Sequence, residues 1–247
     1  MYKLIDRAAL KRNAKALMRE GMVSPVKMAI LYLTIDFVFS IALHAVSVAL
    51  GGSVFENGLP LLFANIFITL VSLVLSTGYV SFCLGTWRRE TLPYASLFDG
   101  FSFAGKIIAL QVIMIFFIYL WSLLFIIPGI IAAYRYSFAM YNLCSNPELG
   151  IFEALNLSKQ QTRGYKMQFF TLQLSFIGWA LLISLPQSVA EAVYEFSASG
   201  INTGSILAFA LMLVTLLGQF FLFPYMQLSF TGFYREATAP IEAAPEF

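Results

Sequence analysis

Long segments almost free of charge constrain the fold of this chain more than any other feature. Between Ile107 and Leu143 the only charged residue is Arg135, and similar apolar segments recur along the 247 residues. Charged residues make up 11% of the chain, whereas an ordinary soluble domain carries about a quarter. Too little polar surface remains to cover a water-soluble domain. We therefore predict an all-α, polytopic integral membrane protein.

Six segments are long and apolar enough to be considered as transmembrane helices. A helix needs about 20 mostly apolar residues to cross a hydrocarbon core of about 30 Å. Pro128 and Gly129 separate the third segment from the fourth, because proline cannot continue a helix and glycine accepts turn conformations. The predicted spans are residues 27–50, 60–87, 107–127, 129–144, 167–186 and 205–234.

The placement of the basic residues supports this six-helix arrangement independently. With six spans, the loops near residues 51–59, 128–129 and 187–204 lie on one side of the membrane and contain no Lys or Arg. The other side receives all of the 15 Lys and Arg residues except Arg135. Because cytoplasmic loops carry an excess of Lys and Arg, we expect both termini inside (N-in, C-in) and the protein in the cell membrane.

The chain divides by composition into three parts. Residues 1–25 are expected to contain an amphipathic basic helix at the membrane interface, residues 26–235 the six-helix transmembrane domain, and residues 236–247 a short cytoplasmic tail. The first helix should span residues 6–19 and lie in the headgroup plane, attracted by anionic lipid. Its candidate headgroup contacts recur every four residues: Arg7, Lys11, Lys15 and Arg19. It serves either as a topology anchor or in lipid sensing and partner docking.

Two further cytoplasmic segments are expected between the spans. Asn146, Pro147 and Glu148 together resemble a helix start, since Asn is a good N-cap, Pro suits the first helical position and Glu complements the helix dipole. Ala154, Leu155 and Ser158 share one face of the helix that should follow. Residues 91–101 hold a similar place before the third span.

Three segments carry a resemblance to a known family. Residues 120–137 read LWSLLFIIPGIIAAYRYS, residues 154–158 read ALNLS, and residues 174–179 read LSFIGW. In these segments the chain resembles the bacterial membrane proteins of domain of unknown function 975. It is more distantly similar to the membrane domain of some glycerophosphodiester phosphodiesterases. The resemblance implies a six-helix protein of the bacterial cytoplasmic membrane, and it implies no activity and no catalytic residue.

Polar residues inside the predicted spans are the candidates for a ligand site, because an ionisable group at mid-bilayer costs about 2.5–3.5 kcal/mol. Asp36, Ser40 and His44 share one face of the first span at 100° per residue. They either line a hydrated cavity for a polar solute or supply interhelical hydrogen bonds. The full candidate set is Asp36, Ser40, His44, Asn65, Arg135, Asn142, Gln173 and Gln219.

An ion pair between Asp36 and Arg135 is not expected. The two residues differ in depth by about 12 Å when counted at 1.5 Å per residue. Helical side chains also lean toward their own N-termini, which moves these two side chains further apart. Arg135 is instead expected either to reach the outer headgroups or to serve the polar site.

The motif content favours binding over catalysis. We find no glycine-rich phosphate loop, no His-Glu-x-x-His zinc motif and no Gly-x-Ser-x-Gly elbow. We therefore expect a non-enzymatic protein without cofactor or metal. The basic residues lack the motifs of nucleic-acid-binding domains, so we expect no nucleic-acid partner.

Three functions remain open from the sequence, and the third is a membrane enzyme, which would need a water-accessible pocket joining His44 to a nucleophile. The leading one is binding, transporting or sensing a small polar or amphipathic molecule, or acting as an accessory to such a system. The alternative is a structural or lipid-responsive scaffold that recruits partners through its cytoplasmic amphipathic helices. The lipid bilayer, and anionic lipid in particular, is the expected partner, and a protein partner or homo-oligomer fits either of these two functions.

Overall fold

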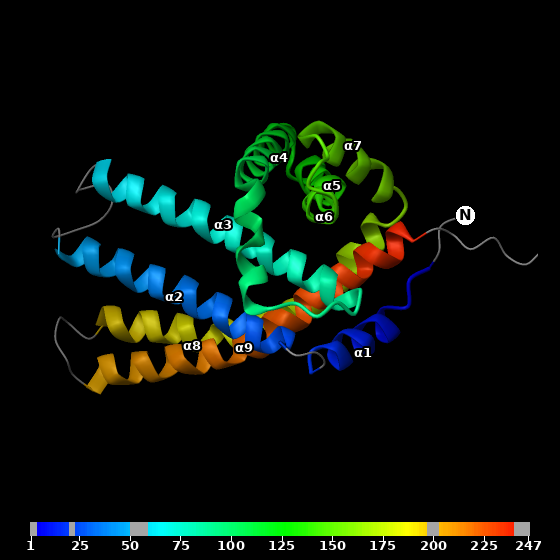
Figure 1. The fold of residues 1–247 in the computed structure, drawn as a ribbon. Coiled ribbons are helices and arrows are strands. Elements are labelled where there is room, and N and C mark those ends of the chain that lie inside the picture. The colour runs from blue at the N-terminus through cyan, green and yellow to red at the C-terminus, as the bar shows by residue number, and fades with distance from the viewer. Residues whose placement is uncertain (1–3, 20–22, 50–58, 197–202, 240–247) are drawn as a thin grey trace, which may run out of the picture.

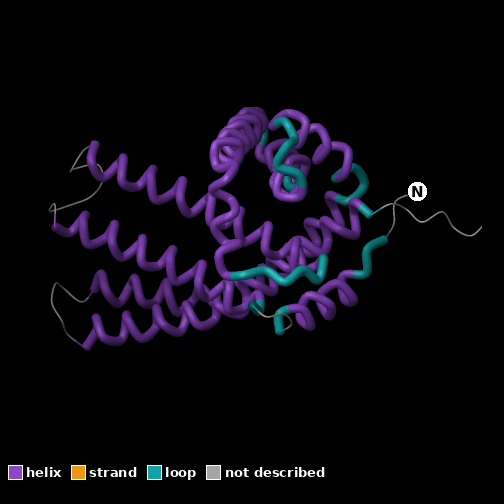
Figure 2. Tube along the Cα trace, viewed as in Figure 1, coloured by secondary structure: helices purple, strands orange, loops and turns teal. Residues whose placement is uncertain are grey.

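The computed structural model describes residues 4–19, 23–49, 59–196 and 203–239, and every regular element within these ranges is a helix (Figure 2). This confirms the all-α prediction. The elements are α1 (Arg7–Leu17), α2 (Pro25–Ala49), α3 (Leu59–Trp87), the 3-10 helix η1 (Tyr94–Phe103), α4 (Ala104–Leu124), α5 (Ile126–Tyr136), α6 (Ala139–Ser145), α7 (Ile151–Gln161), α8 (Lys166–Phe196) and α9 (Thr203–Thr238).

Four long helices form the frame of the molecule. In Figure 1, the axes of α2, α3, α8 and α9 run in roughly the same direction, with the last residues of α2 and α8 and the first residues of α3 and α9 at one end. The opposite end gathers α1, α6 and α7 around the start of α8 and the end of α9. The helices α4 and α5 are seen nearly end-on in the same view, so they lie across the direction of the frame.

Five helical stretches are long and apolar enough to cross a membrane, which supports a membrane protein. They are Pro25–Leu43, Leu61–Trp87, Tyr94–Leu124, Lys166–Ala190 and Ile206–Thr238. Six spans and the N-in, C-in orientation are not confirmed. The predicted fourth span, residues 129–144, is divided between α5, with 11 residues, and α6, with 7 residues. Neither reaches the roughly 20 residues that one crossing needs.

The division between α5 and α6 has a tertiary cause. Ser158 of α7 donates a hydrogen bond from Oγ to the Arg135 carbonyl at 2.9 Å, and the same Oγ accepts from the Phe138 backbone N–H at 3.2 Å. Thr162 also donates to the Arg135 carbonyl, at 3.3 Å. Side chains that form hydrogen bonds with backbone N–H and C=O groups, in place of the i→i−4 partners of the helix, interrupt that helix.

The turn between α4 and α5 comes three residues earlier than predicted. It lies at Phe125, whose backbone is extended with φ −160° and ψ 151°. Pro128 then falls in the first turn of α5, where the N–H that proline lacks has no intrahelical partner to lose. The prediction of two helices in this region was therefore right, and the position of the break was wrong.

The helices predicted outside the membrane spans agree with the predictions in part. Asp6 caps α1 by accepting hydrogen bonds from the N–H groups of Ala8 at 2.9 Å and Ala9 at 3.2 Å, which confirms the first helix. The prediction that the later helix starts at Asn146 was wrong, because α7 begins at Ile151. Asn146 instead ends α6, and its side chain forms a local turn by accepting from the Glu148 N–H at 3.2 Å.

The buried core lies toward the end that holds α1, α6 and α7. Phe138, Phe176 and Phe233 are almost fully buried there and pack with Phe169 and Tyr234. The other ends of the long helices expose apolar side chains, which is the surface that hydrocarbon accepts at no cost. Examples on α3, α8 and α9 are Phe63, Phe67, Leu181, Leu182 and Phe209.

Candidate functional site

The structure distributes the predicted intramembrane polar residues over separate helix junctions. Asp36 of α2 accepts a hydrogen bond from Ser72 Oγ of α3 at 2.6 Å. Gln173 of α8 accepts one from the Tyr134 hydroxyl of α5. Each of these bonds joins two helices, as polar side chains commonly do inside helical membrane proteins.

Asn142 occupies a third junction, deep in the aromatic core. Its Nδ2 donates to the Ala154 carbonyl of α7 at 3.4 Å, and its Oδ1 accepts from the Tyr234 hydroxyl of α9 at 3.0 Å. This amide therefore connects α6 with α7 and α9. Its surroundings differ entirely from those of Asp36.

The remaining candidates are not drawn into one cavity. Ser40, Asn65 and Arg135 have exposed side chains, and Gln219 is half-buried. Arg135 takes part in the packing described above through its backbone carbonyl. His44 lies in α2, but its side chain falls outside the described part of the structure.

The basic helix α1 is docked on the bundle, and its apolar face is occupied. Leu10, Ala14 and Leu17 are buried against the neighbouring helices. Arg7, Lys15 and Arg19 are exposed, as headgroup contacts should be. Lys11 is directed differently, since its Nζ donates to Ser175 Oγ of α8 at 2.6 Å and lies 4.2 Å from the centre of the Phe176 ring.

The pKa values of Lys11 and Asp6 are both lowered, which favours the neutral form of the lysine and the charged form of the aspartate. Burial, followed by the nearby charge of Arg7, lowers the pKa of Lys11. Hydrogen bonds from the backbone N–H groups of Ala9 and Ala8 lower the pKa of Asp6, because they favour the carboxylate form. The N-cap of α1 is therefore charged at neutral pH.

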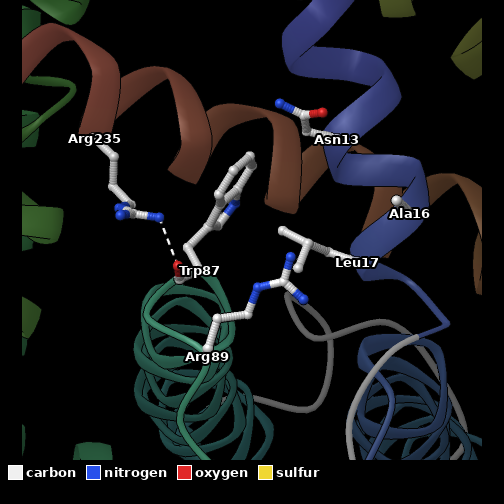
Figure 3. Close-up of a pocket in the computed structure, with 6 residues that line it drawn as sticks. All are labelled: Asn13, Ala16, Leu17, Trp87, Arg89 and Arg235. Atoms are coloured by element: carbon white, nitrogen blue, oxygen red, sulfur yellow. Dashed lines mark hydrogen bonds between the residues drawn. The ribbon is translucent and has the colours of Figure 1, made fainter.

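A pocket of about 330 Å³ opens between α1 and the basic ends of α3 and α9 (Figure 3). Its lining combines two guanidinium groups, an amide, an indole ring and two apolar side chains. The lining residues are Asn13, Ala16, Leu17, Trp87, Arg89 and Arg235. We refer to this pocket as the Trp87 pocket.

Trp87 is fixed from two sides. Its indole Nε1 donates to the Leu228 carbonyl of α9 at 2.9 Å. Arg235 donates from Nη1 to the Trp87 carbonyl at 2.6 Å, and its guanidinium carbon lies 5.5 Å from the ring centre. A cation over an indole face at this distance is a favourable arrangement. The guanidinium of Arg235 is thus held in place by Trp87, which also forms a wall of the pocket.

Arg89 supplies the second cation from an unusual backbone conformation. Its φ of 61° is left-handed, which is uncommon for residues other than glycine. Such strain is often found at functional positions. Figure 3 shows the Arg89 guanidinium directed toward Leu17, on the side of the Trp87 pocket opposite to Arg235.

The chemistry of this lining suits an amphipathic anion. Arginine forks bind phosphate and carboxylate through paired, charge-assisted hydrogen bonds. The half-buried indole of Trp87 offers a surface for a short apolar part of the same molecule. Two further pockets, of about 250 and 450 Å³, lie beside the start of α1 and are both lined by Leu4, Ile5 and Asp6. The smaller one shares Asn13 and Trp87 with the Trp87 pocket.

The sequence did not single out the residues of this pocket. In the sequence, Arg89 and Arg235 contribute only to the charge asymmetry between the two sides of the membrane, and Trp87 is one of three tryptophans without a distinguishing motif. The one local signal is the tripeptide Trp87-Arg88-Arg89 directly after an apolar span. Nothing in the sequence indicates that Arg235 and Asn13, far apart along the chain, meet this tripeptide.

Comparison with known proteins supports part of the resemblance seen in the sequence. Residues 123–240, just under half of the chain, match the model of a family described as "Protein of unknown function (DUF975)". The match covers α5 to α9 and supports this family. No curated protein and no solved structure matches the chain. The more distant similarity to glycerophosphodiester phosphodiesterases has no support from these comparisons.

Proposed function

We propose that this chain is a non-enzymatic integral membrane protein that binds a small amphipathic anion at the face bearing α1. Transport, sensing or an accessory role to such a system would each begin with this binding step. The observation that carries the proposal is the placement of Arg89 and Arg235 on opposite sides of Trp87 in a pocket of about 330 Å³.

The orientation in the membrane forms part of the proposal. The basic residues of α1, Arg88 and Arg89 after α3, and Arg235 at the end of α9 gather at one end of the molecule. The positive-inside rule assigns such an end to the cytoplasm. The Trp87 pocket would then open at the cytoplasmic surface of the cell membrane, where anionic headgroups are available.

Lipid contact at this level gives the ligand a natural source. The exposed basic residues of α1 attract anionic lipid, and the Trp87 pocket lies directly beneath this helix. A phosphate on a glycerol backbone would place its charge between the arginines and its first carbons against the indole of Trp87. We therefore expect a phosphate-bearing amphiphile to bind better than free phosphate.

The first test measures binding of short-chain lipids to the purified protein in neutral detergent. Dioctanoyl phosphatidylglycerol, dioctanoyl phosphatidylcholine and inorganic phosphate are titrated separately, with the dissociation constant and the thermal shift as readouts. Phosphatidylglycerol should bind at least tenfold more tightly than phosphatidylcholine. Tighter binding of inorganic phosphate than of phosphatidylglycerol would identify a phosphate site without an apolar part.

A pair of variants tests whether phosphatidylglycerol binds in the Trp87 pocket. The test variant is Arg89→Asn, and its matched control is Arg88→Asn. Each change removes one positive charge from adjacent positions, but Arg88 does not line the pocket and lies 3.8 Å from Glu90. Asn tolerates the left-handed backbone at position 89. A charge-assisted hydrogen bond contributes about 1.5–3 kcal/mol, so Arg89→Asn should weaken binding tenfold or more and Arg88→Asn less than twofold. Equal losses would indicate a diffuse electrostatic surface and contradict the proposal.

A further inference from the structure

The hairpin formed by α4 and α5 carries a large apolar surface that the other described helices leave uncovered. The exposed fraction is 67% for Tyr119, 70% for Leu123 and 77% for Ile126. From Ile107 to Tyr134 the sequence contains no charged residue. Exposure of an apolar surface of this extent to water is unfavourable. Exposed apolar patches of this size mark contacts with a membrane or with another protein.

Only the base of the hairpin packs on the rest of the protein. Ile107 and Leu110 of α4 are fully buried and belong to the same cluster as Val74 of α3 and Tyr136 of α5. The two arms also pack closely on each other, because a Cβ at Gly129 would lie 2.0 Å from Ser122 Oγ. The hairpin is therefore one unit, and its base contacts α3, α6, α7 and α8.

The direction of the hairpin differs from that of the crossing helices. Figure 1 shows α4 and α5 nearly end-on, whereas α2, α3, α8 and α9 extend across the view. If the four long helices cross the membrane, the hairpin lies close to the membrane plane.

The charges of α1 locate the membrane boundary on the bundle. Lys11 contacts Ser175 of α8, while Arg7 and Lys15 on the same helix are exposed and require water or headgroups. Hydrocarbon therefore begins near Ser175. The rest of α8, up to Phe196, is about 30 Å long at 1.5 Å per residue, which equals the thickness of the hydrocarbon core.

The hairpin leaves the bundle beside this boundary. The Tyr134 hydroxyl of α5 donates to Gln173, and its ring packs edge-on against Phe169 at 6.1 Å and Phe170 at 5.8 Å. These three residues of α8 lie two to six positions before Ser175, which is within about 9 Å along the helix at 1.5 Å per residue. The base of the hairpin thus contacts α8 close to the level at which Lys11 of α1 contacts it.

We propose that the α4–α5 hairpin lies in the plane of the cytoplasmic leaflet, embedded among its acyl chains, and does not cross the membrane. The crossings are then α2, α3, α8 and α9. This even number agrees with the contact between α1 and the end of α9, which places the first and the last described helices on one side.

Acyl chains fit this surface better than a second copy of the chain. The exposed apolar residues of α4 cover about half of its circumference at 100° per residue. They continue over the tip onto α5, where Ile127, Ile130 and Ile131 are also exposed. A surface that is apolar on α4, on α5 and around the tip matches a surrounding solvent of hydrocarbon. An interface would bury one side and leave the others exposed.

Single cysteines test this arrangement, with Cys83 and Cys144 replaced by alanine. Ile126→Cys marks the hairpin tip, Leu59→Cys the start of α3 at the far end of the frame, and Glu148→Cys the exposed connection between α6 and α7. Intact cells are treated with a membrane-impermeant maleimide. We expect labelling at position 59 and none at positions 126 and 148. Labelling at position 126 equal to that at position 59 would overturn the proposal in favour of a crossing hairpin.

A second measurement keeps the proposal testable if labelling is weak everywhere. The purified Ile115→Cys protein, labelled at an exposed position in the middle of α4, is coupled to a bimane fluorophore and placed in liposomes containing lipids with a nitroxide either near the headgroup or at the end of the acyl chain. A hairpin in one leaflet predicts stronger quenching by the shallower nitroxide, whereas a crossing α4 places position 115 near the bilayer centre and predicts stronger quenching by the deeper one. Absence of quenching by both lipids, together with cross-linking between copies at position 126, would show a protein interface and contradict the proposal.

Discussion

Gly232 is the residue on which the position of α1 depends most directly. A Cβ at this position would lie 2.4 Å from Cζ2 of Trp87 and 2.8 Å from Cδ1 of Leu10. The absence of a side chain lets the indole of α3 and the apolar face of α1 meet on the surface of α9. The shape of the Trp87 pocket follows from this contact, because Trp87 and α1 form two of its walls.

Gly232→Ala should therefore destabilise the protein. Overpacking at a close contact costs about 1–3 kcal/mol, although alanine is favoured over glycine in a helix by about 1 kcal/mol. Gly178→Ala is the matched control, since a Cβ at that position of α8 meets nothing within 4 Å. Thermal unfolding in detergent should show a lower Tm for Gly232→Ala and an unchanged or higher Tm for Gly178→Ala. A Tm that shifts in the same direction in both variants would contradict this role.

Lys11 shows how far residue spacing can predict a contact. The four-residue repeat places Arg7, Lys11 and Lys15 along one side of α1, whereas Arg19 lies in the turn after the helix ends at Leu17. Periodicity gives the face of a residue on its own helix and carries no information on what packs beside it. The proximity of Ser175, 164 positions away, turns Lys11 from a headgroup contact into a contact with α8.

At the scale of the element, helix boundaries set by local groups could be predicted, and boundaries set by tertiary contacts could not. The start of α1 depends on Asp6 and the N–H groups two and three residues later, so the sequence is sufficient. The break between α5 and α6 depends on Ser158, which is 20 positions from the N–H of Phe138. Pro128, the local signal for a break, is accommodated inside α5 instead.

Replacing Ser158 with alanine tests this tertiary cause. The Phe138 N–H would lose its buried acceptor, whereas the Arg135 carbonyl would keep its bond from Thr162. A buried donor without a partner costs about 1–3 kcal/mol. Ser184→Ala is the control, because the Ser184 hydroxyl is exposed and bonds only to the Leu181 carbonyl of its own helix. We expect a lower Tm for Ser158→Ala alone, and equal Tm values for the two variants would refute the explanation.

At the scale of the whole molecule, composition predicts the class of protein but not the number of crossings. Few charges and long apolar segments suffice to predict an all-α membrane protein. The number of crossings depends on the direction of the α4–α5 hairpin, which follows from contacts such as Val74 with Ile107 and Tyr134 with Gln173. An apolar hairpin in the membrane plane and one across the membrane have the same hydropathy, so the sequence cannot distinguish them.

The location of the two chain ends tests the arrangement of the whole molecule. An even number of crossings places both ends on one side, whereas crossing by all five apolar stretches would place them on opposite sides. Green fluorescent protein, which is fluorescent only when it folds in the cytoplasm, and alkaline phosphatase, which is active only outside, are each fused before Met1 and after Phe247. Both fusion sites should give fluorescence without phosphatase activity, and phosphatase inserted after residue 200 should be active.

Because the basic end carries Arg88, Arg89 and Arg235 beside α1, its translocation would violate the positive-inside rule. Phosphatase activity at either chain end would therefore contradict the cytoplasmic placement of the Trp87 pocket.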